Sequence, residues 1–249
     1  ENGKEYNVLL VAFDGLQARH LQSYGYEKNP APNLEKFLEN SYLFRRTVSP
    51  ASWTVPTYMS VFTGMYPSEH GVVNKFVDFD PASGEGTQAN LKRLSPKAIT
   101  LAEVLRENGY KTAGFTGDAG VGKAFGYDQG FDEYFETAPF GGFDETAGRA
   151  LAWLEKNKDE KFFLFLHGYD AHGQHDFDYD YRYADPARVT AYTGSKEEQR
   201  DIRETGLAGD LALSEDDVAF WRAVYDEKIS RADEEFARFL AKTEEAGAL

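Results

Sequence analysis

A threonine at the start of a short predicted helix is the first residue whose type and position suggest chemistry. Residues 49–71 read as a loop that turns into a helix, with Thr54 at the expected N-cap, Pro56 in the first turn and Gly64 just past the end. A helix N-terminus has free N–H groups and positive partial charge, so it suits a phosphate or a sulfate. Thr-x-Pro is also an ordinary capping sequence, so a role for Thr54 needs support from elsewhere in the chain.

Asp14 is the second candidate, because it follows an almost unbroken apolar run over residues 7–13. Such a run predicts a strand that is buried on both faces, as in a parallel sheet covered by helices. Ligands of open α/β sheets bind at the carboxyl ends of strands, so Asp14 is a candidate metal ligand or general base. The alternative is a plain turn, since Asp14-Gly15 is a turn dipeptide.

A third polar group follows the apolar run 162–166, which predicts a second buried strand. His167, Asp170 and His172 come directly after this run, and His175 and Asp176 lie a little further on. Imidazole and carboxylate groups bind metals and substrates, although a solvated polar loop has the same composition. The position beyond a strand end favours a functional role for His172. The glycine-rich stretch 117–123 also follows a predicted strand, but its spacing is not that of a P-loop, so it is interpreted as a plain loop.

The elements that must position these residues alternate between strands and helices. Thr100-x-x-Glu103 reads as a capping box and Ser214-x-x-Asp217 resembles one. Helices are expected to start at residues 30–33, 100 and 214, and a further helix is expected over 145–157. Strands are expected over 44–48 and 111–115. The segments 73–96 and 183–213 are expected to be irregular and to lie on the surface. The apolar stripe of the long helix that begins after Ser214 is interpreted as core packing, and this helix should end near Gly247.

Composition limits the possible partners. The 249 residues have 41% hydrophobic content, which is enough for a sizeable core, and no cysteine, which excludes disulfides and thiolate metal sites. A net charge of −15 argues against nucleic acid and against an anionic membrane surface. No run reaches the ~20 apolar residues that span a bilayer. The first residue is Glu1, which fits a processed exported protein or a trimmed chain.

Taken together, the motifs resemble the sulfatase family of the alkaline phosphatase superfamily, and they do so in one order along nearly the whole chain. They are the strand ending in Asp14, Tyr24-Gly-Tyr26 with Ala31-Pro-Asn-Leu34, Ser52-Trp-Thr-Val-Pro-Thr57, Thr63-Gly-Met-Tyr-Pro-Ser-Glu-His-Gly71, Gly109-Tyr-Lys-Thr112, Gly130-Phe-Asp132, and the strand ending in His167, Asp170 and His172.

The resemblance implies an alkaline-phosphatase-like α/β sandwich with a mainly parallel central sheet flanked by helices, formed by residues 1–249 as a single domain. Asp14 then matches the family's strand-end metal ligand, Thr54 the nucleophile position, and His172 the substrate-binding histidine. His167 and Asp170 are supporting candidates for substrate binding. The implied cofactor is a divalent metal ion (Ca, Mg, Mn or Zn), which would also contact Thr54.

The sequence departs from the family pattern at several positions. Sulfatases have a cysteine or serine that becomes formylglycine where this chain has Thr54, and Tyr58 replaces the following arginine. Gly15 stands in place of a second aspartate. The family's Gly-Lys-x-His is not found, so Lys123 is the remaining candidate for a substrate-binding cation. The Asp-His-Gly or Asp-Asn-Gly that completes the metal site does not follow the last helix, so the C-terminal part of the fold is expected to be absent.

The resemblance predicts a metal-dependent hydrolase of sulfate or phosphate esters with Thr54 as nucleophile. The expected substrate is a small anionic ester. We expect the protein to bind no nucleic acid, to have no membrane span and to be periplasmic or secreted. Two alternatives stay open: a non-catalytic, degenerate fragment of a sulfatase-like protein, and a transferase of phosphate-bearing groups.

Overall fold

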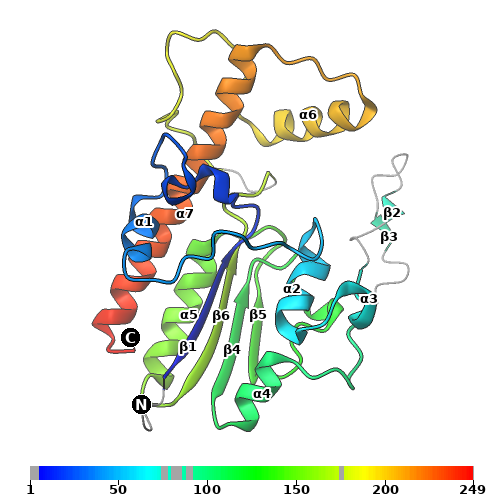
Figure 1. Ribbon diagram of the computed structural model, residues 1–249, viewed down its shortest axis with the longest axis vertical. Helices are drawn as coiled ribbons and strands as arrows, with labels where there is room; N and C mark the ends of the chain where they lie inside the picture. The colour runs from blue at the N-terminus through cyan, green and yellow to red at the C-terminus, as the bar shows by residue number, and fades with distance from the viewer. Residues whose placement is uncertain (1–5, 74–77, 80–85, 88–91, 174–176, 249) are drawn as a thin grey trace.

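A four-stranded parallel sheet forms the centre of the molecule (Figure 1). The computed structural model describes residues 6–73, 78–79, 86–87, 92–173 and 177–248. Within them the sheet has the order β1-β6-β4-β5, and all its pairs are parallel. The strands are β1 (Val8–Phe13), β4 (Lys111–Thr116), β5 (Glu133–Glu136) and β6 (Phe162–Gly168). Because the strands run in one direction, the residues after β1, β4 and β6 lie together at the carboxyl end of the sheet.

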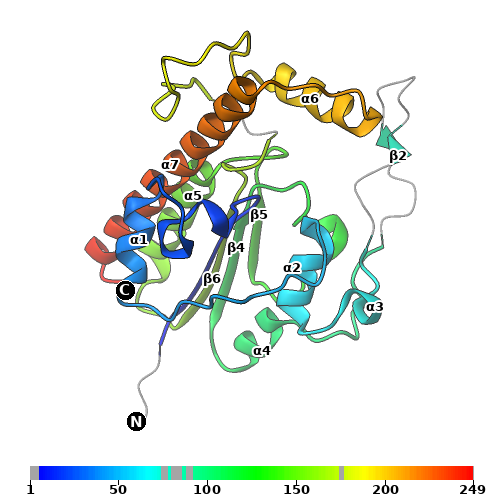
Figure 2. The same cartoon turned by 45° about the horizontal axis from the view of Figure 1, so that its top comes forward.

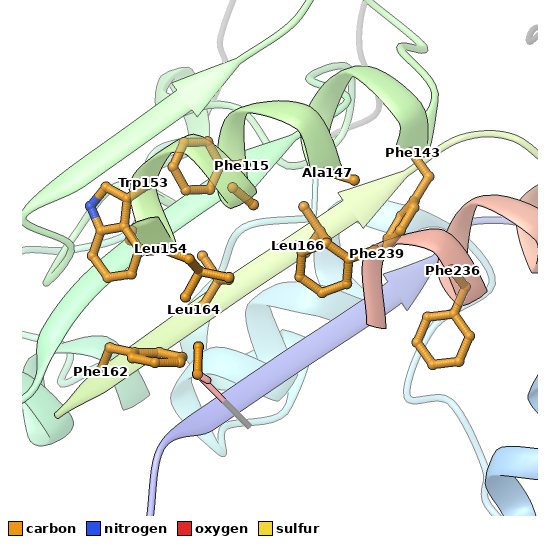
Figure 3. Packing of buried hydrophobic residues seen from close by; sticks show 13 residues of the cluster. Phe115, Phe143, Ala147, Trp153, Leu154, Phe162, Leu164, Leu166, Phe236 and Phe239 are labelled. Carbon is orange, nitrogen blue, oxygen red and sulfur yellow. The ribbon is translucent and has the colours of Figure 1, made fainter. Parts of the chain in front are cut away.

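The central strand β6 forms two hydrophobic cores, one on each face of the sheet. Every one of its residues is buried. Phe162, Leu164 and Leu166 face one core, and the alternate residues Phe163 and Phe165 face the other, as the two-residue period of a strand requires (Figure 3). Burying the strand on both faces fixes its register, since a slip of one residue would exchange the two sets of side chains.

Helices cover both faces of the sheet (Figures 1 and 2). On one side lie α1 (Pro32–Leu38), α5 (Phe143–Asn157) and α7 (Glu215–Glu245), and on the other lie α2 (Thr54–Thr63), α3 (Pro67–His70) and α4 (Leu101–Glu107). The short elements are the 3-10 turns Ala18–His20, Gln22–Tyr24 and Lys123–Phe125, and the antiparallel pair of β2 (Asp78–Phe79) with β3 (Gly86–Thr87). The described helices include none that is long and apolar enough to cross a membrane.

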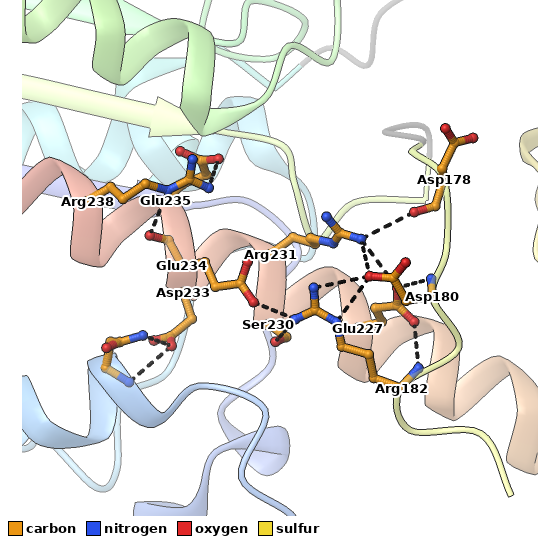
Figure 4. A network of polar contacts seen from close by, with 11 residues as sticks. Asp178, Asp180, Arg182, Glu227, Ser230, Arg231, Asp233, Glu234, Glu235 and Arg238 are labelled. Atoms are coloured by element: carbon orange, nitrogen blue, oxygen red, sulfur yellow. Dashed lines mark hydrogen bonds and ion pairs between the residues drawn. The ribbon is translucent and has the colours of Figure 1, made fainter.

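The N-terminal half of α7 extends beyond the sheet. There it lies near α6 (Lys196–Ala208) and residues 177–195, which precede α6 (Figure 2). This segment is fastened to α7 by ionic contacts (Figure 4). Asp180 accepts a hydrogen bond from Arg231 at 2.8 Å, Arg182 pairs with Glu234, and buried Glu227 accepts from the Asp180 amide at 2.6 Å. These contacts hold residues 177–195 against α7, beyond the carboxyl end of the sheet.

Most of the predicted elements are confirmed, including both capping boxes and the end of α7 before Gly247, which has φ +71°. Four expectations are wrong. The expected surface segment 73–96 contains the short antiparallel pair of β2 with β3. Residues 44–48 form no strand, and Phe44 and Val48 are exposed. The segment 183–213 contains the helix α6. β1 is only partly buried, because it lies at an edge of the described sheet instead of inside it. Residues 74–77, 80–85 and 88–91 of the expected surface loop lie outside the described residues.

Candidate active site

The carboxyl ends of β1 and β6 bring Asp14 and His167 together. The Asp14 amide donates to the Gly168 carbonyl at 2.9 Å, which continues the strand pairing to the first residue of the loop. His167 Nε2 lies 3.6 Å from Asp14 Oδ2, and the histidine is fully buried. Neither ring nitrogen of His167 has a hydrogen-bond partner among the described residues. Nε2 has only this longer contact with Asp14 and Nδ1 has none, which is costly for a buried imidazole, so this position suits a bound group.

Asp14 is held in its ionised form. Burial alone would raise the pKa of its carboxyl group, but interactions with His167, His172 and the Thr54 hydroxyl outweigh burial and lower this pKa below its usual 3.8. A carboxylate with a lowered pKa is a poor proton acceptor near neutral pH. The environment therefore favours Asp14 as a ligand for a cation over Asp14 as a general base.

Thr54 begins α2 beside this carboxylate. The structure places it as the first residue of the helix, with Trp53 as the N-cap, so the expected N-cap position is off by one residue. Pro56 lies in the first turn and Gly64, with φ +68°, ends the helix as predicted. The Thr54 hydroxyl interacts with both Asp14 and Tyr169. The threonine is thus at the positive end of a helix and next to the candidate metal ligand.

The glycine-rich loop after β4 forms a wall against Thr54, which the sequence interpretation as a plain loop did not anticipate. A Cβ atom at Gly120 would lie 2.7 Å from Thr54 Cβ and Cγ2, so only glycine fits there. The preceding residues, Asp118 and Ala119, both have positive φ, near +55°. Such strained backbone persists only where the surroundings enforce it, and it is frequent at functional sites.

Tyr169 connects the glycine-rich loop to the threonine and is a residue that sequence reasoning missed. Its buried hydroxyl accepts a hydrogen bond from the Gly120 amide at 2.8 Å. Because an amide N–H can only donate, the Tyr169 proton is free to point toward Thr54. Burial and the nearby Asp14 charge raise the pKa of Tyr169, so it remains a protonated donor. Tyr58, at the position of the family's arginine, has a raised pKa for the same two reasons.

His172 borders the same site from the β6 loop. Its ring stacks on Phe140, with centroids 5.3 Å apart, and meets the ring of Tyr169 edge-on. Phe140 has φ +63°, a second strained position in this region. The His172 charge contributes to the lowered pKa of Asp14, so the two side chains lie within electrostatic range.

The remaining predicted residues lie in other surroundings. Asp170 is buried and accepts the Phe143 amide at 2.9 Å, so its described contacts include capping of α5. Lys123 is exposed on the 3-10 turn, and its backbone bonds to Glu136 and Arg93. None of the described contacts joins Lys123 to Thr54 or Asp14. His175 and Asp176 lie outside the described residues.

A buried cation that the sequence did not single out lies in α7. Lys228 is 2% exposed, and its Nζ donates to the His172 carbonyl at 2.9 Å. Its place in a helix gave no signal, since the apolar stripe around it predicts only packing. Lys228 thus brings positive charge to the loop after β6 that carries His172.

The donors present fit part of a divalent metal site. Asp14 supplies a carboxylate, Thr54 a hydroxyl, and the orphaned nitrogens of His167 an imidazole ligand. Among the described residues there is no group of three or more histidine, aspartate or glutamate side chains that could hold a metal ion. Further ligands would have to come from water, from substrate or from residues outside this set.

Comparison with known proteins identifies the family and the fold of the chain. A family profile described as Sulfatase matches residues 6–249. The structure is similar to the phosphonate monoester hydrolase of Agrobacterium radiobacter, with a TM-score of 0.70 and 18% identity, over 98% of this chain and 60% of that one. It is also similar to the C-terminal periplasmic domain of EcEptC from Escherichia coli in complex with Zn, with a TM-score of 0.57 and 15% identity, over 99% of this chain and 62% of that one.

A shorter match is to the bis(5'-adenosyl)-triphosphatase ENPP4 of Bos taurus, which is 34% identical over 67 residues. These residues are 26% of this chain and 14% of that protein. The chain thus aligns with about three fifths of each of these two solved structures and with a small part of the triphosphatase.

Proposed function

Since the chain belongs to the sulfatase family, we propose that it is the part of a metal-dependent hydrolase of sulfate or phosphate esters that supplies the nucleophile Thr54 and the metal ligand Asp14. The observation that supports this most is the meeting of the Thr54 hydroxyl, at the N-terminus of α2, with the ionised Asp14 carboxylate at the end of β1. The named activities of the similar proteins, on phosphonate monoesters and on a bis(5'-adenosyl) triphosphate, agree with a substrate that carries an anionic phosphorus group.

The metal would be held by Asp14, with Thr54 and His167 as further ligands. A bound divalent cation would lower the pKa of the Thr54 hydroxyl and offset negative charge on the ester oxygens. Which of Ca, Mg, Mn or Zn fills the site is left to experiment, although the zinc in the Escherichia coli neighbour makes zinc the first ion to test.

The side chains have separable roles in this proposal. Thr54 gives its hydroxyl proton to water, and its Oγ1 forms a bond to phosphorus or sulfur as the bond to the ester oxygen breaks. Tyr169, fixed by the Gly120 amide, donates to Thr54 and orients its oxygen. His172 binds a substrate oxygen or protonates the leaving alcohol. Water then hydrolyses the threonine ester, restores the Thr54 hydroxyl and releases the sulfate, phosphate or phosphonate. Asp170 and Lys123 remain candidates for contacts with the substrate farther from the reacting atoms.

The test is an assay of the complete gene product on aryl sulfate, aryl phosphodiester and phosphonate monoester substrates with each added metal. Thr54→Ala should lower kcat by at least about a hundredfold, the scale of losing a covalent nucleophile. Thr63→Ala, at the other end of the same helix, is the matched control and should retain activity. Equal activity of the wild type and Thr54→Ala would overturn the assignment of the nucleophile.

The second candidate is a degenerate fragment without catalysis, and the lack of a three-ligand metal group among the described residues favours it. Calorimetric titration with Zn, Mn, Mg and Ca separates the two, because a degenerate site has no reason to bind tightly. Stoichiometric binding that Asp14→Asn abolishes would support the hydrolase. A periplasmic or secreted location is proposed from the periplasmic neighbour and is tested by fractionation of the native cells. A transferase would differ only in passing the group to an acceptor alcohol.

A further inference from the structure

One turn of α7 is bonded to both loops that carry candidate reactive residues. Tyr225 donates its hydroxyl to the Gly15 carbonyl at 2.6 Å, in the loop after β1 that begins with Asp14. Lys228, on the neighbouring turn of the same helix face, donates its Nζ to the His172 carbonyl at 2.9 Å, in the loop after β6. The two loops also touch, because a Cβ atom at Gly15 would lie 3.4 Å from His172 Cα. This turn of α7 therefore fixes where the two loops lie relative to each other.

The helix is firmly attached at the point from which Lys228 extends. The two residues before it are buried carboxylates, Asp226 and Glu227. Asp226 is hydrogen-bonded to His20 and to Tyr26, at 2.7 Å in each case, and Glu227 accepts the Asp180 amide at 2.6 Å. Because these bonds tie the helix to segments on different sides of it, the backbone from which Lys228 extends has a defined position.

The backbone of His172 is held on both sides of its Cα atom. Its amide donates to the Tyr169 carbonyl at 2.8 Å, and its carbonyl accepts the bond from Lys228. Its ring stacks on Phe140 and meets the Tyr169 ring edge-on. Loss of the Lys228 bond would let the peptide group after His172 rotate, and the direction of the imidazole would then be less well defined.

Stability of the fold does not by itself explain a lysine at this position. Lys228 is 2% exposed, and burying an ammonium group costs free energy even where the group has partners. An apolar side chain of similar length would pack here without that cost. What the lysine adds is a charged donor, whose hydrogen bond to a carbonyl is stronger than that of a neutral donor.

We propose that Lys228 is a positioning residue, which holds the His172 carbonyl so that the imidazole keeps its place against Phe140 and Tyr169 at the border of the Thr54 centre. Lys228 acts through His172 and touches neither the ester nor the metal. The inference rests on the proposed function, since it is His172 that contacts the substrate there.

The kinetic test is a double-mutant cycle on the complete gene product, with whichever ester it cleaves. Lys228→Met keeps the length of the side chain and removes the donor, and it should lower kcat/KM at least about tenfold, as expected for a displaced catalytic group. In a His172→Gln background the same change should cost less than about twofold, because no imidazole is left to position. Lys242→Met, which changes an exposed lysine of the same helix, is the matched control and should leave kcat/KM unchanged.

A second measurement does not depend on turnover. In NMR spectra of the complete protein with 13C-labelled histidine, the His172 signal is identified by its loss in His172→Gln. The aromatic rings packed against His172 displace this signal, and Lys228→Met should move it toward the position of a solvent-exposed histidine. Lys228→Gln, which is polar but shorter, is a second variant and should have the same effect. Phe239→Leu removes buried packing near the C-terminal end of α7, so it controls for lost stability and should leave the signal in place.

The outcomes separate the inference from the proposed function. Equal losses of kcat/KM with and without the imidazole, or an unmoved His172 signal in both Lys228 variants, would overturn the positioning role and leave the hydrolase intact. If no ester is cleaved with any metal, the proposed function fails, and the His172 signal then decides the inference alone. An equal movement of the signal in Phe239→Leu would also overturn the inference, since lost stability would then explain it.

Discussion

At the residue scale, the close approach of one glycine to Thr54 gives the sharpest test of the site. Gly120→Ala would place a methyl group 2.7 Å from Thr54 Cβ and Cγ2, at a position without positive φ. The threonine would have to move, and we expect activity of the complete protein to fall about a hundredfold, as for a displacement of about 1 Å in an active site.

Gly148→Ala is the control for this substitution. Gly148 lies inside α5, and a Cβ atom there would meet nothing within 4 Å, so the change should stabilise the helix by about 0.5–1 kcal/mol and leave activity unchanged. Full activity of Gly120→Ala would show that the loop does not restrict Thr54.

The sequence predicted Asp14, Thr54 and His172 because strand ends and helix N-termini can be recognised locally. Tyr169, Gly120 and Lys228 could not be predicted in the same way. Their roles depend on contacts with residues distant in the chain, such as the bond of the Gly120 amide to Tyr169, 49 residues away. A buried lysine inside an amphipathic helix has no local signature at all.

At the element scale, α2 is held in place by the helix that follows it. His70 of α3 accepts the Val72 amide at Nδ1, 3.0 Å away, and its Nε2 lies 3.2 Å from the Ser60 hydroxyl of α2. An accepting Nδ1 requires the neutral tautomer with the proton on Nε2. Burial agrees with this and lowers the pKa of His70 below its usual 6.5.

The stability of the protein should therefore depend on pH through His70. Its neutral form is favoured by folding, so its contribution is complete above pH 6.5 and is lost as the pH falls through the lowered pKa of the folded state. In urea titrations between pH 7 and pH 5, the wild type should lose free energy of unfolding relative to His70→Gln, whose amide makes similar bonds without titrating. Parallel pH profiles would contradict this role.

Periodicity explains which elements were foreseen. β6 and α7 were predicted because buried strands and amphipathic helices leave apolar patterns in the sequence. α6 has no buried residue and is mostly polar, so it gives only a weak apolar signal, and its clearest local marks are the capping box at Ser195 and the Gly209 C-cap. The expected strand at 44–48 failed because its apolar residues are exposed and have no sheet to pair with.

At the scale of the whole molecule, β1 has the paired strand β6 on one side and the open edge of the described sheet on the other. The Asp14 amide bonds to β6, so by strand alternation the amides of Leu10 and Ala12 point toward β6, and those of Leu9 and Val11 point toward the open edge of the described sheet. The sequence could not predict this, because an apolar run reads the same in a central strand and in an edge strand.

Hydrogen exchange followed by NMR should resolve this alternation. We expect the amides of Leu9 and Val11 to exchange about a hundredfold faster than those of Leu10 and Ala12, and the amides of β6 to be the slowest. The β6 amides serve as the internal control because both of their neighbours are paired strands. Equal protection along β1 in the 249-residue chain would mean that another segment or a second copy covers the edge.

Tyr225 makes two kinds of contact, which limit the substitutions that this position can accept. Its ring lines a cavity that Gly15, His172 and Trp221 also line, while its hydroxyl donates to the Gly15 carbonyl at 2.6 Å and accepts the Gln17 amide at 2.8 Å. Any exchange there that reshapes the cavity also unfastens the turn next to Asp14. Trp221 has no such tie among the described hydrogen bonds, so substitutions at position 221 should reshape the cavity and leave the turn beside Asp14 in place.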